Sequence, residues 1–112
     1  MNESPNRPPE APDPTAGRIR SALQRILDPE LHINIVDLGL VYGISFVQGV
    51  AQIRMTLTSP GCPYGPYLLH CVKTATRAIQ GVSRVTVEVV WDPPWGPDKM
   101  SDDVRLQLGF DI

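Results

Sequence analysis

The sequence contains little of what usually reveals the function of a short chain. Only 2 of its 112 residues are cysteine, and 10 Lys and Arg residues stand against 12 Asp and Glu, for a formal net charge of -2. Without a basic cluster, the chain has no electrostatic footprint for nucleic acid or an anionic membrane. No apolar run approaches the ~20 residues that a membrane span requires, and no apolar secretory signal lies near the N-terminus. We therefore expect a cytoplasmic protein that binds neither nucleic acid nor membrane.

The two cysteines, Cys62 and Cys71, are not spaced as a disulfide. If both lie on or beside one helix, a rise of ~1.5 Å per residue places their Cα atoms roughly 13 Å apart, whereas a disulfide spans at most ~7 Å. We expect two free thiols, which suits a reducing compartment. Iron–sulfur clusters are usually held by four thiolates, so a monomer cannot hold a conventional cluster alone. A cluster would be shared across a dimer, completed by a partner or small thiols, or bound only transiently.

The length suits one domain with a single modest core. Residues 1–14 are polar and rich in proline, which predicts a disordered tail, and residues 15–112 are expected to form the domain. Apolar periodicity and turn residues predict six elements: a helix that Asp13 or Thr15 caps and that ends before Asp28, strands at 40–47 and 50–57 joined by a Gln48-Gly49 turn, a helix at 63–79, a strand at 84–91, and a helix that Ser101 caps and Gly109 ends. The order α-β-β-α-β-α is typical of a small α/β (α+β) domain, with an open sheet built from a β-hairpin and a crossover strand.

The strongest functional signal is the segment Thr58-Ser59-Pro60-Gly61-Cys62-Pro63. A strand pattern precedes it, and Pro63 suits the first turn of a helix, because its missing N–H costs nothing there. Cys62 is therefore expected at a helix N-terminus, where the helix dipole and free N–H groups favour the thiolate, the form that attacks electrophiles and ligates metals. The alternative is a small buried apolar residue. The Gly and Pro neighbours favour a loop, and hence a functional thiol.

Two other groups of polar residues have both a functional and a structural interpretation. Asp28, Glu30 and His32 lie together after the first helix, where they could ligate metal or transfer protons. A solvated turn in which Asp28 bonds local backbone is the favoured interpretation. Thr56 and Thr58 fall on the polar face of the second strand, where they line a pocket floor or simply occupy an exposed strand face.

The remaining candidates are Cys71 and two tryptophans. Cys71 lies on or near the apolar stripe of the second predicted helix, which favours a structural role. Trp91 and Trp95 flank an Asp-Pro-Pro turn that cannot pair in a sheet. They either pack at the edge of the core or form a rigid aromatic surface for a partner.

Five blocks of the sequence occur in the order and spacing of a known family: Asp28-Pro-Glu30, Ile35-Val-Asp37-Leu-Gly-Leu-Val-Tyr42, Met55-Thr-Leu-Thr-Ser-Pro-Gly-Cys62-Pro63, Gly81-Val82 and Val90-Trp-Asp-Pro-Pro-Trp95. On these blocks the chain, from about Arg18 to Phe110, resembles the SufT and PaaD-like proteins, which are iron–sulfur cluster assembly and maturation factors. PaaD proteins usually carry a further cysteine-containing C-terminal extension. This sequence ends at Ile112 without one, so the resemblance is closer to SufT.

The resemblance implies a compact α/β fold, often a homodimer, that delivers clusters to apo-proteins or matures metalloenzymes. The family's residues map onto Asp28, Glu30, Thr56, Thr58 and Cys62, expected around one shallow site with Cys62 as reactive thiol and transient ligand of iron or an iron–sulfur cluster. No tightly bound cofactor and no enzymatic activity are expected. The expected partners are iron–sulfur assembly proteins and apo client proteins.

Two other functions stay open on the sequence. The first is a metal-free adaptor that binds assembly proteins or clients through the Trp91–Trp95 surface. The second is a thiol-dependent enzyme in which His32 activates Cys62, since nucleophilic catalysis needs a base within hydrogen-bond reach of the thiol.

Overall fold

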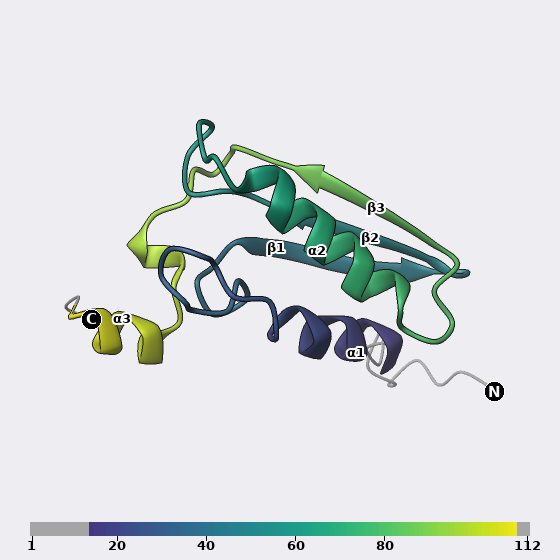
Figure 1. Cartoon of the computed structure of the whole chain (residues 1–112). Coiled ribbons are helices and arrows are strands. Elements are labelled where there is room, and N and C mark those ends of the chain that lie inside the picture. Colours follow the sequence, from purple (N-terminus) through teal and green to yellow (C-terminus); the bar gives the residue numbers. More distant parts are fainter. Residues whose placement is uncertain (1–13, 110–112) are drawn as a thin grey trace, which may run out of the picture.

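Three strands form a mixed sheet whose one face is covered by two helices (Figure 1). The computed structural model describes residues 14–109, in which the elements are α1 (Pro14–Leu23), β1 (Val41–Val47), β2 (Val50–Met55), α2 (Gly65–Arg77), β3 (Arg84–Val89), the short 3₁₀ helix η1 (Pro97–Lys99) and α3 (Asp102–Leu108). The predicted order α-β-β-α-β-α is confirmed, with η1 as an addition. The predicted disordered tail lies outside the described residues except for Pro14, which is the first residue of α1.

The sheet consists of a hairpin and a crossover strand, as predicted. Strands β1 and β2 pair antiparallel, and β2 and β3 pair parallel, so β2 lies in the centre and α2 is the crossover. The turn residues Gln48 and Gly49 both have positive φ, 50° and 82°, as in the turns that match the twist of a two-residue hairpin. A β-bulge interrupts β1 between Val41 and Gly43.

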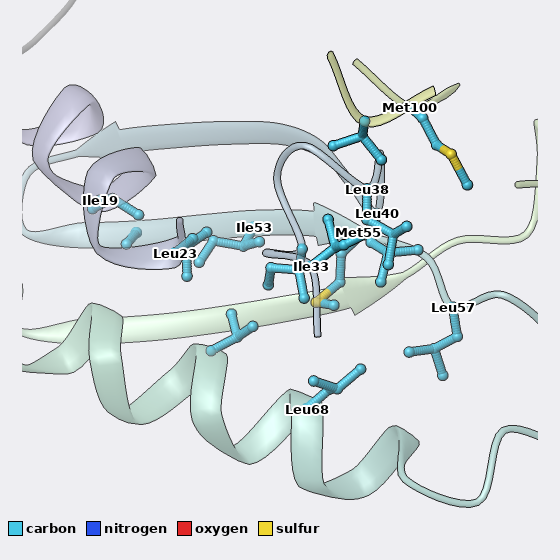
Figure 2. Close-up of a cluster of buried hydrophobic side chains, with 14 residues drawn as sticks. Ile19, Leu23, Ile33, Leu38, Leu40, Ile53, Met55, Leu57, Leu68 and Met100 are labelled. Atoms are coloured by element: carbon cyan, nitrogen blue, oxygen red, sulfur yellow. The ribbon is translucent and has the colours of Figure 1, made fainter. Parts of the chain in front are cut away.

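The core lies between the sheet and the helices (Figure 2). The predicted alternation holds along β2, where Ala51, Ile53 and Met55 are fully buried while Gln52 and Arg54 are exposed. Most other core residues come from α1, α2 and the irregular segment before β1: Ile19, Leu23, Leu68, Val72, Ile33, Ile35, Leu38 and Leu40. Leu57, Met100 and Val104 complete the core. This apolar layer fixes the two helices on the sheet.

Several element ends differ from those that the sequence predicted. Helix α1 ends at Leu23, because the N–H groups of Arg25 and Ile26 donate to carbonyls three residues earlier and Leu27 then forms a bridge with Asn34. Strands β2 and β3 end at Met55 and Val89. The last helix follows its prediction: the Ser101 Oγ accepts from the Val104 N–H at 3.3 Å, and Gly109 ends the helix with a φ of 89°.

None of the helices within residues 14–109 has the length and apolar character needed to cross a bilayer.

Candidate functional site

Cys62 lies in a turn between β2 and α2, at one end of the sheet. The Cys62 N–H donates to the Ser59 carbonyl, and the Cys62 carbonyl accepts from the Gly65 N–H, both at 3.2 Å. The preceding residues Ser59, Pro60 and Gly61 are exposed, whereas Cys62 is partly buried against the edge of the core. The thiol therefore belongs to a surface turn that is anchored on the core.

The prediction that α2 begins at Pro63 was wrong. The helix begins at Gly65, after Tyr64 as N-cap, and Pro66 occupies its first turn. Both prolines satisfy the rule that favours proline at a helix start, and the sequence cannot distinguish them. Because the effect of the helix dipole falls off within the first turn, the argument that the helix start favours the Cys62 thiolate loses its geometric basis.

A hydrogen bond joins the Cys62 turn to the loop after α1. The Tyr64 hydroxyl donates to the Glu30 Oε1 at 2.6 Å, across 34 residues of sequence. This hydrogen bond raises the pKa of Tyr64, and burial and the negative charges of Asp28, Glu30 and Cys62 raise it further. Three predicted site residues thus surround Tyr64, a residue that the sequence analysis did not select.

Asp28 organises this loop from inside. Its side chain is 1% exposed, and Oδ1 accepts from the N–H groups of Glu30 and Leu31 at 2.8 and 2.9 Å. The prediction that Asp28 bonds local backbone is confirmed, but the turn is not solvated at this residue. Asp28 therefore fixes the turn that holds Glu30 against Tyr64. The side chain of His32 is exposed, and its backbone N–H donates to the Asp28 carbonyl at 2.8 Å.

The two threonines occupy different environments. Thr56 is fully buried: its N–H donates to the Leu40 carbonyl at 2.8 Å and its hydroxyl to the Leu57 carbonyl at 3.4 Å. Of the two alternatives for Thr56, the exposed strand face is wrong, because β2 ends at Met55 and the alternation ends with it. Thr58 is partly exposed, in the segment that leads to Cys62.

The remaining cysteine does not complete a metal site. Cys62 and Cys71 are both free thiols, as predicted, and Cys71 lies within α2, where its contact with the Tyr67 hydroxyl raises the pKa of that tyrosine. Within residues 14–109, no group of three or more His, Cys, Asp or Glu side chains is arranged to hold a metal ion. The Cys62 turn thus offers one thiol, an incomplete set of ligands for a metal ion or cluster.

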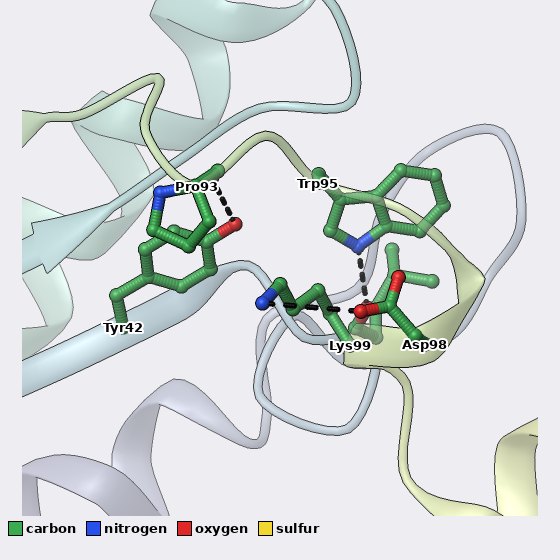
Figure 3. Close-up of polar contacts among 6 residues, drawn as sticks. Tyr42, Pro93, Trp95, Asp98 and Lys99 are labelled. Atoms are coloured by element: carbon green, nitrogen blue, oxygen red, sulfur yellow. Dashed lines mark hydrogen bonds and ion pairs between the residues drawn. The ribbon is translucent and has the colours of Figure 1, made fainter.

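The two tryptophans separate into a packed and an exposed residue. The Trp95 indole N–H donates to the Leu38 carbonyl at 2.8 Å (Figure 3). The Trp95 ring packs against the core. Trp95 therefore has the core-edge role, the first of the two alternatives for the tryptophans. Trp91 is 44% exposed.

Comparison with known proteins decides the family. The model of a family described as "Iron-sulfur cluster assembly protein" matches residues 17–89. The Fe-S protein maturation auxiliary factor SufT of Staphylococcus aureus is 46% identical over 85 residues, which cover 75% of this chain and 97% of SufT. The chain belongs to this family. The resemblance to SufT is thereby confirmed.

Two further similar proteins are a longer carrier protein and a domain with a solved structure. An iron-sulfur cluster carrier protein of Mycobacterium bovis is 34% identical over 91 residues, which cover 80% of this chain but 22% of the carrier. A crystal structure of a domain of unknown function, DUF59, from Bacillus anthracis superimposes with a TM-score of 0.80 at 35% identity. It covers 88% of this chain and 94% of that one, which confirms the small α+β fold.

Tyr64 is the residue of the site that sequence reasoning missed. Its contact with Glu30 spans 34 positions, so no local pattern reports it. The available signal was indirect: an aromatic residue with a polar tip lies two positions after the candidate thiol, and buried tyrosine hydroxyls usually find a partner.

The Tyr64 hydroxyl provides a pH test of this geometry. Its pKa is raised above the ordinary value of 10.0, so the folded state retains the proton that the unfolded state loses. The stability that this group contributes is complete below pH 10 and is lost as the pH rises above it. Absorbance at 295 nm, compared between wild type and Tyr64→Phe, should show Tyr64 ionising above pH 10. Glu30→Gln should bring the pKa back towards the ordinary value. A wild-type Tyr64 that ionises at pH 10 would contradict the contact.

Proposed function

We propose that this chain is an accessory factor in the maturation of iron–sulfur proteins and that Cys62 transiently ligates its cargo, iron or an iron–sulfur cluster. The observation that carries the proposal is the match to SufT over 97% of that protein's length. The placement of Cys62 in a surface turn, two residues before the Tyr64 whose hydroxyl donates to Glu30, supports its role as ligand.

The ligand set favours transfer over storage. Thiolate sulfur suits iron–sulfur clusters, and the Glu30 carboxylate supplies an oxygen contact within the same surface. Thr58 would donate a hydrogen bond to sulfur, and Asp28 would position Glu30 through its backbone bonds. The missing ligands would come from a second copy of the chain, an assembly protein or an apo client. Because part of the ligand set belongs to another protein, the chain alone would hold its cargo weakly, and the cargo could pass to an apo client that supplies more ligands.

The proposal extends to the setting in which the chain works. Its partners would be iron–sulfur assembly proteins and apo clients, in the cytoplasm, where free thiols persist. A homodimer would bring two Cys62 thiolates together. The chain would act without enzymatic turnover, because handing over a cluster requires ligand exchange and no change in a substrate.

Loss of the chain tests the proposed function. In cells from which its gene has been deleted, a [4Fe–4S] dehydratase should lose most of its activity under iron limitation, while a metal-free enzyme keeps its own. Expression of the wild-type chain should restore the dehydratase. Equal dehydratase activity with and without the chain, at equal protein levels, would overturn the proposal.

The exposed Trp91 favours one alternative, a metal-free adaptor. Its side chain is 44% exposed in a loop that the Trp95–Leu38 hydrogen bond holds in place, and rigid aromatic side chains are enriched at interfaces. For an adaptor, Trp91→Ala would abolish rescue in the deletion strain, and Cys62→Ser would rescue fully. No observation in the described part of the chain places the His32 imidazole against the Cys62 thiol, so the adaptor is the alternative that the structure favours over a thiol enzyme.

A further inference from the structure

A concave site separate from the Cys62 turn lies where the segment after β3 passes β1 and β2. It is a pocket of about 430 Å³, open to the surface, and it shares no lining residue with the Cys62 site. Polar side chains come from three elements: Tyr42 from β1, Arg54 from β2 and Lys99 from η1. The apolar part of the wall comes from Val36, Val41 and Pro93.

The two charged side chains that line the pocket are both cations. Its lining contains a guanidinium and an ammonium group but no carboxylate. Each cation has a carboxylate neighbour outside the lining, with 3.8 Å between Arg54 Nε and Glu88 Oε1 and 3.9 Å between Lys99 Nζ and Asp98 Oδ2. Both carboxylate side chains are largely exposed, at 57% and 74%. Exposed ion pairs of this length contribute little to stability. An entering anion can therefore compete with Glu88 and Asp98 for the two cations.

The walls of the pocket are held in place before any ligand arrives. The Tyr42 hydroxyl donates to the Pro93 carbonyl at 2.8 Å, and Trp95 fixes the same loop on Leu38 (Figure 3). The Lys99 ammonium lies 5.8 Å from the centre of the Tyr42 ring.

Gly39 brings the opposite wall to the backbone of η1. Its φ is +90°, and a Cβ on this residue would lie 2.2 Å from the Lys99 carbonyl oxygen, so the two backbones are in direct contact. Because these walls are already ordered, less conformational entropy is lost when a ligand binds.

We propose that this pocket binds a small organic carboxylate with an apolar body. Arg54 would receive the carboxylate, because the guanidinium matches the geometry of two carboxylate oxygens, and Lys99 would add a second charge. The apolar body would lie against Val36, Val41 and the Tyr42 ring. A cavity of this size lies within the range of small-molecule sites. The site requires neither Cys62 nor a metal.

Benzoate is the probe that tests the proposal. Titrated into the ¹⁵N-labelled full chain at constant pH and ionic strength, it should saturate with a Kd of about 1 mM. The shifted amide signals should be those of Gly39, Tyr42, Arg54 and Lys99. Benzamide, which lacks the charge, and inorganic phosphate, which lacks the apolar body, should each bind at least about tenfold more weakly.

Two arginine variants give the matched comparison. Arg54→Gln should weaken benzoate binding about tenfold or more, with the fold confirmed by its amide spectrum. Arg84→Gln removes an exposed arginine that does not line the pocket, and it should leave the Kd unchanged. The proposal is overturned if phosphate or benzamide binds as tightly as benzoate, if the shifted signals lie elsewhere, or if Arg54→Gln binds benzoate like the wild type.

Discussion

Cells that carry Cys62→Ser are expected to show no more iron–sulfur enzyme activity than cells that lack the chain. Serine differs by one atom, but its hydroxyl stays protonated at neutral pH and is a poor ligand for iron, whereas the thiolate is the metal-binding form of cysteine. Cys62 is only partly buried, so the variant should fold, with a loss of stability of about 1 kcal/mol or less. The measurement is dehydratase activity in the deletion strain, at matched levels of the expressed chain.

Cys71→Ser is the control for this result. It removes the other thiol, which is also partly buried but lies within α2, and it should rescue like the wild type. If Cys62→Ser rescued fully, the role of the thiol would be wrong, and the adaptor function would become the better account.

Asp28→Ala is expected to lower the free energy of unfolding by about 2–4 kcal/mol. The change removes the buried carboxylate that accepts from the N–H groups of Glu30 and Leu31 in a partly buried turn, and a hydrogen bond to a charged group contributes about 1.5–3 kcal/mol. Urea denaturation of the two proteins measures the difference. An alanine variant as stable as the wild type would show that these bonds contribute nothing to the fold.

Asp28→Asn separates positioning from charge. The amide oxygen can take the place of Oδ1, so the cost should be smaller, about 1 kcal/mol. If Asp28 acts only by holding the turn that presents Glu30, this variant should also support iron–sulfur enzyme activity in cells. A folded asparagine variant without activity would instead assign the carboxylate a direct role.

The sheet could be predicted from the sequence because its signals are local. Alternation along 50–57 and the Gln48-Gly49 turn identify the hairpin within two residues of its observed bounds. Helix ends were less predictable. Pro63 and Pro66 each fit the first turn of a helix, so the start of α2 could not be fixed. Leu27 was predicted to be helical but forms a β-bridge with Asn34, which no local sequence pattern indicates.

The site was predictable in its residues and not in their arrangement. The sequence blocks selected Asp28, Glu30 and Cys62, but the Tyr64–Glu30 hydrogen bond that joins their two segments depends on tertiary packing. Thr56 shows the reverse case: its spacing placed it on the polar face of the strand, at a pocket floor or an exposed surface, yet β2 ends at Met55 and Thr56 is buried.

Anaerobic reconstitution of the purified chain with iron and sulfide tests the central claim most directly. Wild type, Cys62→Ser and Cys71→Ser are compared by absorption, Mössbauer spectroscopy and gel filtration. We expect an iron–sulfur chromophore in wild type and Cys71→Ser and none in folded Cys62→Ser; one cluster per two chains in a dimer would place it between two Cys62 thiolates. A chromophore of equal intensity in Cys62→Ser, or none in any of the three proteins, would contradict direct ligation by Cys62.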